Sequence, residues 1–390
     1  MATPALIWDP ALLAYDLGGH HPFNPLRLDL TMRLAAEFGV LDGIPIMSPK
    51  AAADSELERA HEPGYIQAVR DAPDYGPDLR HGLGSEDNPV FAGMHDAAAL
   101  VVGGSVLAAE QIAHGNVSRA VSIAGGLHHA MSDHASGFCV YNDCAVAISW
   151  LLDHGFDRIA YVDTDVHHGD GVQAAFYGDP RVLTVSMHQH PHTLWPGTGF
   201  PSELGTANAV GSAVNIALPP RTADAPWLRA FHAVVPSLLR QFQPQLLVTQ
   251  CGVDTHAEDP LADLALSVDG HRAIYRTLRE LATECADGRW LAIGGGGYQL
   301  VRVVPRSWTH LLATILDRDL APDTLLPSGW LRHVAECAPP TRLPETMSDG
   351  ADTEFERWGG DSEQQVDLAI ADTRNAVFPL HGLDPDDPRD

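Results

Sequence analysis

Short apolar runs alternate with longer amphipathic segments along most of this 390-residue chain. Each apolar run has the length of a buried strand, and each amphipathic segment repeats its apolar residues at helical spacing. The predicted strands are Ala5–Trp8, Ala120–Ala124, Arg158–Val162, Val182–Ser186, Ala213–Leu218, Leu246–Gln250 and Trp290–Ile293. The predicted helices are Pro25–Phe38, Gly93–His114, Asp143–His154, Gly169–Tyr177, Pro226–Phe242, Ser267–Ala286 and Gln299–Leu316. Strands that alternate with helices predict an α/β fold, with one mostly parallel sheet covered on both faces.

The alternating pattern ends near Leu331. Segment 336–390 holds 14 acidic and 4 basic residues, several prolines and little periodicity. We therefore expect one domain over residues 1–335, followed by an acidic C-terminal segment that is irregular or wraps over the core. Its apolar run Ala376–Leu380 is the part that we expect to dock on the core.

The composition narrows the range of partners and compartments. The 24 basic and 51 acidic residues leave a net charge of −27, which repels nucleic acid and attracts a cationic ligand. The five cysteines form no CxxC pair, which favours reduced thiols in the cytoplasm over a disulfide framework or a cysteine-rich zinc site. Residues 1–10 lack the basic and apolar regions of a secretory signal. No apolar run reaches the length of a membrane span, so we expect none.

The segment Asp163–Asp170, DTDVHHGD, follows the predicted strand Arg158–Val162. In an extended chain, Asp163, Asp165 and His167 would point to one face. Burying two carboxylates and an imidazole together is costly unless their charge is compensated, and a divalent metal would compensate it. A polar loop with a helix cap is the alternative interpretation.

Three further polar segments follow predicted strands: Gly125–His129, Cys251–His256 and Gly294–Tyr298. Open parallel sheets bind their ligands beyond the carboxyl ends of the strands. We therefore expect these segments and the Asp163–Asp170 segment to meet at one edge of the sheet.

At that edge, Asp165, His167 and Asp254 would form a set of three protein ligands. A set of three leaves a position open for water, which is typical of catalytic metal sites. The donors suit Zn²⁺ and would also accept Fe²⁺. Such a metal would polarise a carbonyl group and activate water, which predicts a hydrolase.

The remaining polar residues of the edge have acid–base chemistry. His128 and His129 follow two glycines in a turn, and Asp163 and Asp170 are the carboxylates left to orient them, one each. A hydrogen-bonded loop is the alternative for the histidine pair. Tyr298 follows a glycine run and would donate a hydrogen bond to a developing oxyanion. A core tyrosine beside a tight turn is the alternative there.

Together these segments resemble a known family. GGLHHA, SGFCVYND, YVDTDVHHGDGVQ, WPGTG, QCGVDTH and IGGGGY occur in the order found in the histone-deacetylase branch of the arginase–deacetylase superfamily, over residues 20–310. HHPFNPLRL, ERAHEPGYI and DTHAEDPL are similar to the bacterial acetoin-utilisation deacetylases. The resemblance implies a single α/β catalytic domain around an eight-stranded parallel sheet. It also implies metal-dependent removal of an acetyl group from an amine, usually lysine.

The resemblance assigns roles to the matching positions of this chain. The implied metal ligands are Asp165, His167 and Asp254. The implied catalytic residues are His128, His129, Tyr298, Asp163 and Asp170, with His129 as general base and acid. The implied substrate-binding residues are Asp87, Gly137, Phe138, Trp195, Leu261 and Gly296, with Trp195 where a phenylalanine is more usual. The implied structural potassium site consists of Asp163, Asp165, His167, Ser186 and Met187.

The function implied by the resemblance is a zinc-dependent deacetylase that converts acetyl-lysine in a protein or peptide to lysine and acetate. An amidohydrolase for acetylpolyamines or small acetylated amines is the alternative enzyme. A catalytically silent binding module of the same fold is the alternative from another class. The arginase branch uses two Mn²⁺ ions and needs carboxylates where this chain has Gly169 and Gly252, so we expect one metal. The oligomeric state is not predicted.

Overall fold

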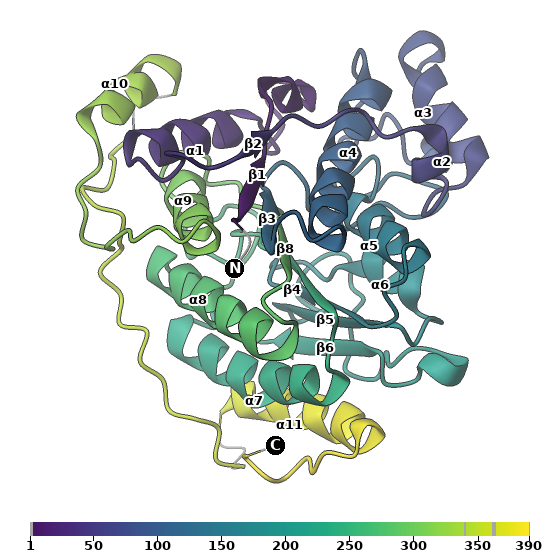
Figure 1. Cartoon of the computed structure of the whole chain (residues 1–390), viewed down its shortest axis with the longest axis vertical. Helices are drawn as coiled ribbons and strands as arrows, with labels where there is room; N and C mark the ends of the chain where they lie inside the picture. Colours follow the sequence, from purple (N-terminus) through teal and green to yellow (C-terminus); the bar gives the residue numbers. More distant parts are fainter. Residues whose placement is uncertain (1–2, 339–340, 361–363, 390) are drawn as a thin grey trace.

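The computed structural model describes residues 3–338, 341–360 and 364–389. Its centre is one sheet of eight parallel strands in the order β2-β1-β3-β8-β7-β4-β5-β6 (Figure 1). The strands are β1 (Ala5–Ile7), β2 (Ile46–Met47), β3 (Arg119–Ser122), β4 (Ile159–Asp163), β5 (Val182–Gln189), β6 (Ala213–Leu218), β7 (Leu246–Gln250) and β8 (Trp290–Ile293). The predicted α/β fold with a parallel sheet is confirmed.

Helices cover both faces of this sheet (Figure 1). The α-helices are α1 (Leu26–Glu37), α2 (Asp54–Leu57), α3 (Pro63–Tyr75), α4 (Met94–Ala113), α5 (Asp143–Asp153), α6 (Asp170–Phe176), α7 (Asp224–Phe242), α8 (Val268–Cys285), α9 (Val304–Ile315), α10 (Ser328–Cys337) and α11 (Gln365–Val377). Helices α4, α5 and α6 pack together on one face, and α1, α9, α8 and α7 form the layer on the other.

The central strands are buried along their whole length, as both-face coverage requires. In the register of the sheet, Asp163 at the end of β4 lies between Gln250 of β7 and Ser186 of β5. Gln250 pairs in turn with Ile293, the last residue of β8. Because these strands end level with one another, the segments that follow them start at the same edge of the sheet.

Some elements differ from the sequence-based expectations. Strand β2 was not predicted, because it spans only Ile46–Met47 and the Ile46 side chain is exposed. Helix α3 was not predicted either. It contains Pro73, and proline within a pattern normally indicates a break. Helix α9 begins at Val304 rather than Gln299, because the chain between them forms turns.

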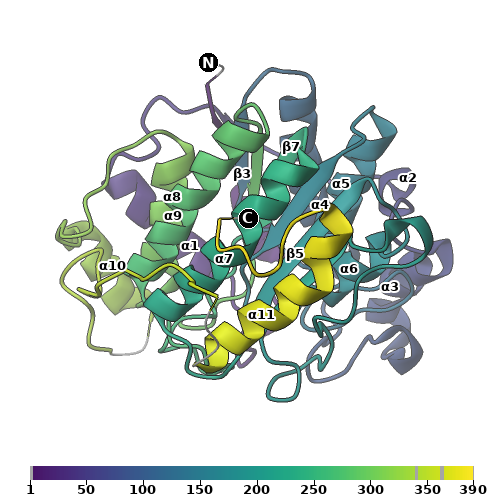
Figure 2. The same ribbon diagram turned by 90° about the horizontal axis from the view of Figure 1, so that it is seen from below.

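The acidic C-terminal segment contains helix α11, which sequence analysis did not predict. The helix lies against α7 and β6. Figure 2 shows α11 from below, beside α7. Its side chains Ile370 and Val377 are fully buried, and so is Phe378 in the following turn. The acidic composition of the segment gave no amphipathic pattern from which to predict this helix. A few apolar side chains are enough to dock it on the core.

One helix in the described part of the chain, α4, has the length and apolar composition of a membrane span. Most of its apolar window is buried inside the fold. It packs against β3 and α5, so its hydrophobicity is that of a core helix.

Candidate active site

The four polar segments meet at the carboxyl edge of the sheet. The backbone N–H of Val166 donates to Asp254 Oδ1 at 2.9 Å, and the N–H of Gly296 donates to Asp165 Oδ2 at 2.8 Å. These bonds join the segments that follow β4, β7 and β8. The histidine turn after β3 joins them through a 2.7 Å bond between His128 Nδ1 and Asp163 Oδ2.

Asp165, His167 and Asp254 form a buried group at the centre of this edge. One ligand atom from each lies within 4.8 Å of the others. His167 Nδ1 is 3.1 Å from Asp165 Oδ1 and 3.2 Å from Asp254 Oδ2. Burial, together with the charge of Asp165, raises the pKa of Asp254 to about 8. Two carboxylates so close together in the interior therefore call for a cation.

The backbone around the group leaves room for the carboxylates. A Cβ atom on Gly252 would overlap Asp165 Oδ2, and one on Gly296 would overlap Asp254 Oδ2. Two carboxylates and one imidazole are donors that suit a divalent transition metal. The residues present therefore fit the catalytic metal that the resemblance implies.

Gln250 also contacts this group, although sequence analysis did not select it. Its side-chain Nε2 donates to Asp165 Oδ2 at 2.8 Å, and its Oε1 accepts from the N–H of Gly252 at 2.7 Å. Such contacts orient a metal ligand. The available signal was a buried amide at the end of an apolar strand, directly before Cys251.

The two histidines each have one carboxylate partner. His128 Nδ1 lies 2.7 Å from Asp163 Oδ2, and His129 Nδ1 lies 2.7 Å from Asp170 Oδ1. Their Nε2 atoms face each other at 2.9 Å. Because one hydrogen fits between two such nitrogens, one ring must accept at Nε2 while the other donates.

The surroundings favour a positive His128 and a neutral His129. Burial and the nearby His128 lower the pKa of His129 to about 4. Burial also opposes a charge on His128, but the carboxylates of Asp163 and Asp165 outweigh it and raise the pKa of His128 to about 9. The two rings therefore differ in charge although they are adjacent in sequence.

The turn that carries both histidines is held by Asp143, which sequence analysis did not select. The carboxylate of Asp143 accepts from the backbone N–H groups of Gly126 and Leu127. Gly126 adopts φ 96°, which a residue with a side chain would rarely adopt. The glycine directly before Leu127 therefore allows the backbone conformation of this turn.

A cavity of about 320 Å³ opens onto this group. Its lining residues are Asp87, His129, Gly137, Phe138, His167, Leu194, Trp195, Leu261 and Tyr298. Sequence analysis selected all of these except Leu194. Gly296 lies behind the ligands, where its N–H contacts Asp165, and His128 is not among the lining residues.

Aromatic rings form the walls of the cavity. Trp195 stands edge-on to His129 with 4.6 Å between ring centroids, and Phe138 stands edge-on to Tyr298 at 5.6 Å. A Cβ atom on Gly137 would overlap both Trp195 and His129. Glycine at this position therefore leaves room for the indole. At the rim, Asp87 is exposed and Leu261 is half-buried.

Tyr298 lines the same cavity as His129. Its backbone N–H donates to Asp259 Oδ2 at 2.8 Å. Burial, followed by the charges of Asp254 and Asp165, raises the pKa of Tyr298 well above its ordinary value. The hydroxyl therefore keeps its proton and remains a hydrogen-bond donor. Arg27 holds the preceding glycine run by donating to the carbonyls of Gly295 and Gly297.

The loop that carries Asp254 is tied to the C-terminal segment. Asp349 Oδ2 lies 2.9 Å from His256 Nε2 and accepts from the N–H of Val268 at the same distance. Its Oδ1 accepts from Arg306 Nη2 at 2.7 Å. Sequence analysis assigned no role to Asp349, because its partners lie between 43 and 93 residues away in the chain.

The residues implied for a potassium site come from β5 and from the end of β4 with the segment that follows it. Ser186 is the register partner of Asp163 across β4 and β5, and buried Met187 follows it. The hydroxyl of Tyr161 donates to Asp163 Oδ2 at 2.7 Å. The sequence pattern did not indicate this contact, because Tyr161 is an ordinary residue of a predicted strand.

Comparison with known proteins agrees with this geometry. Residues 21–315 match the model of the histone deacetylase domain. The acetoin utilization protein AcuC of Bacillus subtilis is 38% identical over 359 residues, which cover 90% of this chain and 91% of that protein. AcuC of Staphylococcus xylosus is 36% identical over 91% of this chain and 92% of its own length.

A solved structure is similar over nearly the whole fold. The crystal structure of an HDAC homolog complexed with SAHA superposes with a TM-score of 0.84 at 28% identity. The superposition covers 96% of this chain and 100% of the chain in that structure. Since the domain match, the relatives and the solved structure agree, this chain belongs to the histone deacetylase family and is a deacetylase of the AcuC type.

Proposed function

We propose that this deacetylase hydrolyses the acetyl amide of acetyl-lysine in a protein or peptide. The observation that carries the proposal is the aromatic-walled cavity with His129, His167 and Tyr298 among its lining residues. Aromatic walls suit the methylene chain of a lysine, and the exposed carboxylate of Asp87 at the rim suits backbone N–H groups of a peptide. The net charge of −27 also favours a cationic substrate.

Asp165, His167 and Asp254 would hold one divalent metal, Zn²⁺ or alternatively Fe²⁺. When bound, the metal would polarise the acetyl carbonyl and lower the pKa of the attacking water. Gln250 and the N–H of Gly296 fix the carboxylate of Asp165 for this task.

His129 is the proton carrier in this proposal. It lines the cavity, and its Nδ1 is oriented by Asp170. To act, Nε2 of His129 exchanges its contact with Nε2 of His128 for one with the attacking water, takes a proton from that water and returns the proton to the leaving amine. His128 does not line the cavity, and its positive charge beside His129 would stabilise the negative charge that develops in the transition state.

Tyr298 supplies the hydrogen bond to the tetrahedral oxyanion. Its hydroxyl stays protonated, and the ring lines the same cavity as His129. Donors that are held in place before the reaction contribute strongly to such catalysis. Phe138 and Trp195 exclude water from the acyl chain.

Asp163, Asp165, His167, Ser186 and Met187 would hold a structural potassium ion. The support is that Ser186 of β5 lies beside Asp163 at the end of β4, and that Asp163 is the partner of His128. A bound potassium ion would add fixed positive charge there. The free state of all five cysteines supports action in a reducing compartment, the bacterial cytoplasm.

A substrate panel tests the proposal. We expect kcat/KM to be highest for acetyl-lysine peptides, lower for acetylpolyamines and lowest for small acetyl amides. Faster turnover of acetylpolyamines would replace the proposed substrate while keeping the chemistry. If metal-loaded protein turned over none of the three, the family fold would here serve binding alone.

A further inference from the structure

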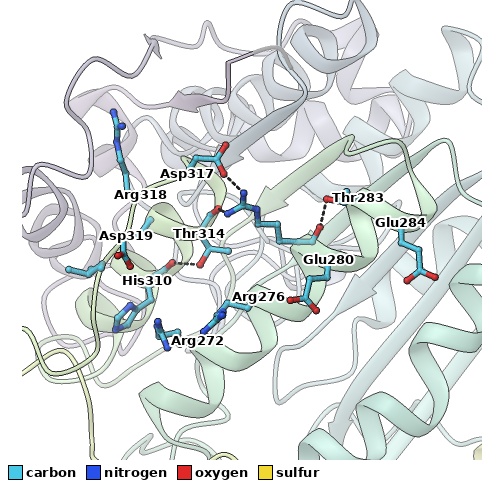
Figure 3. Close-up of a pocket in the computed structure, with 13 residues that line it drawn as sticks. Arg272, Arg276, Glu280, Thr283, Glu284, His310, Thr314, Asp317, Arg318 and Asp319 are labelled. Atoms are coloured by element: carbon cyan, nitrogen blue, oxygen red, sulfur yellow. Dashed lines mark hydrogen bonds and ion pairs between the residues drawn. The ribbon is translucent and has the colours of Figure 1, made fainter.

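A second cavity, of about 800 Å³, lies along helices α8 and α9 and the turn after α9 (Figure 3). Its lining shares no residue with that of the active-site cavity. Arg272, Arg276, Arg279 and Arg318 are among the lining residues. The volume is that of a pocket for a small molecule.

Two of these arginines form no ion pair within the described part of the chain. Arg272 and Arg276 lie one helical turn apart on α8, and neither makes a hydrogen bond or ion pair with any residue that the structure describes. Arg272 is half-buried. Burial, followed by the charge of Arg276, lowers the pKa of Arg272. Like charges four residues apart destabilise a helix, so the folded chain gains nothing from this pair by itself.

The other two arginines are only partly neutralised. Arg279 shares the carboxylate of Asp317 with Arg119, so one negative charge faces two guanidinium groups. Arg318 donates to the backbone carbonyls of Val40 and Asp42, which satisfy its N–H groups without cancelling its charge.

The carboxylates of the cavity do not neutralise all of the arginine charge around it. Glu284 is bound by Arg240 outside the cavity at 2.7 Å. Glu280 and Asp319 form no ion pair within the part of the chain that the structure describes. The lining itself holds four arginines and four carboxylates. Arg119 and Arg240 pair with two of these carboxylates, Asp317 and Glu284, from outside the lining, and Asp269 acts on Arg272 from nearby. With these neighbours counted, six guanidinium groups stand against five carboxylates. A local excess of cations contrasts with the chain's net charge of −27.

We propose that this cavity binds a small phosphorylated anion, held by the guanidinium groups of Arg272 and Arg276. A guanidinium group presents two parallel N–H donors that match two phosphate oxygens. The cavity is larger than one phosphate group needs, so the ligand would carry an organic part against α9. His310, buried in the lining, donates from Nε2 to the carbonyl of Met347 at 3.0 Å. Its pKa is lowered by burial to about 4, so it leaves the binding charge to the arginines.

Calorimetric titration of the metal-loaded full-length protein with inorganic phosphate, at low ionic strength, tests the site. We expect saturable binding that Arg272→Gln or Arg276→Gln weakens by about tenfold, the usual loss for one charge-assisted hydrogen bond. Arg332→Gln makes the same charge change at an exposed position of α10 and is the matched control. Its affinity should stay within about twofold of the parent, well below the loss expected at the site.

Two further titrations separate the alternatives. Binding should survive in Asp254→Ala, which removes a proposed metal ligand, because the site is independent of the catalytic metal. Tricarballylate, which offers carboxylates without phosphate, should bind more weakly than phosphate. The proposal is wrong if the parent shows no saturable binding, if Arg332→Gln loses as much affinity as the cavity variants, or if tricarballylate binds better. Unchanged circular dichroism and melting temperature would show that each variant is folded.

Discussion

The two cavities of this deacetylase differ in how their charged side chains are paired. In the active site, each histidine of the pair has a carboxylate partner at 2.7 Å, and the carboxylates of Asp165 and Asp254, the proposed metal ligands, accept from backbone N–H groups. In the cavity along α8 and α9, named the arginine cavity here, Arg272 and Arg276 make no hydrogen bond or ion pair with a described residue. The first arrangement is preorganised for chemistry within the chain, whereas the second is completed only by a ligand.

The comparison explains why the same kind of substitution should act differently in the two places. Removing a charge from the active site leaves another buried charge without its partner, which is costly. Removing one from the arginine cavity relieves a repulsion. Substitutions at both sites therefore test the comparison directly.

The largest effect is expected for Asp254→Ala, which deletes a ligand that is fully buried. The variant should lose most of its bound divalent metal and nearly all activity, because only two protein ligands remain. Metal analysis of the purified protein and turnover of an acetyl-lysine peptide measure both. Asp263→Ala, an exposed position of the same loop, is the control and should keep metal and activity. Full, chelator-resistant activity in Asp254→Ala would contradict the assignment of the metal site.

His129→Ala should come next, with a loss of about 10²–10⁴-fold in kcat, the usual contribution of a general acid–base group. His128→Ala should lose less, because His128 lies outside the cavity lining. Both variants should keep the metal. A greater loss in His128→Ala, with fold and metal intact, would reverse the two roles.

Tyr298→Phe removes one hydroxyl and keeps the ring. We expect a loss of about 10²–10³-fold in kcat, as for one oxyanion donor, with metal content unchanged. Tyr75→Phe makes the same change on an exposed ring and should have no effect. If Tyr298→Phe stays within about threefold of the parent, far short of that loss, the ring serves only as a wall.

The pH profile of kcat tests the two histidine charges. Burial and His128 lower the pKa of His129 to about 4, so His129 can accept a proton above that pH, and activity should fall as pH approaches 4. The carboxylates around His128 outweigh its burial and raise its pKa to about 9, so its charge and the activity should decline above pH 9. Asp163→Asn removes one of these carboxylates and should shift the alkaline limb to lower pH. An unmoved limb would assign it to another group.

The smallest effect is expected in the arginine cavity without ligand. Arg276→Gln should leave the melting temperature unchanged or slightly raised, since relief of a like-charge pair on a helix contributes roughly 0.2–0.5 kcal/mol. Asp170→Asn in the active site should lower it, because His129 Nδ1 loses a charged acceptor. Differential scanning calorimetry measures both. Added phosphate should raise the melting temperature of the parent more than that of Arg276→Gln. A clear destabilisation by Arg276→Gln alone would show that Arg276 already has a stabilising role.

Much of the fold was predictable because most of its strands are short apolar segments that can be recognised in the sequence. Seven of the strands are continuous apolar runs bounded by turns, as expected for a parallel sheet buried on both faces. The two-residue strand β2 and helix α11 were not predictable. Their positions depend on neighbours, β1 for the first, α7 and β6 for the second, and not on a local pattern.

The residue types around Asp165, His167 and Asp254, placed at the ends of apolar strands, already indicated a metal-dependent hydrolase, because few other chemistries need that set of side chains there. The contact of Gln250 with Asp165 and that of Asp349 with Val268 were decided by the tertiary structure, since they join residues 85 and 81 positions apart in the chain. The difference in charge between His128 and His129 was decided there too. Adjacent identical side chains differ only through the carboxylates, the burial and the cavity that the fold places around each. The arginine cavity could not be predicted from the sequence either. There, the arginines of α8 indicate only the polar face of a helix. That face becomes part of a pocket only because α8 packs against α9.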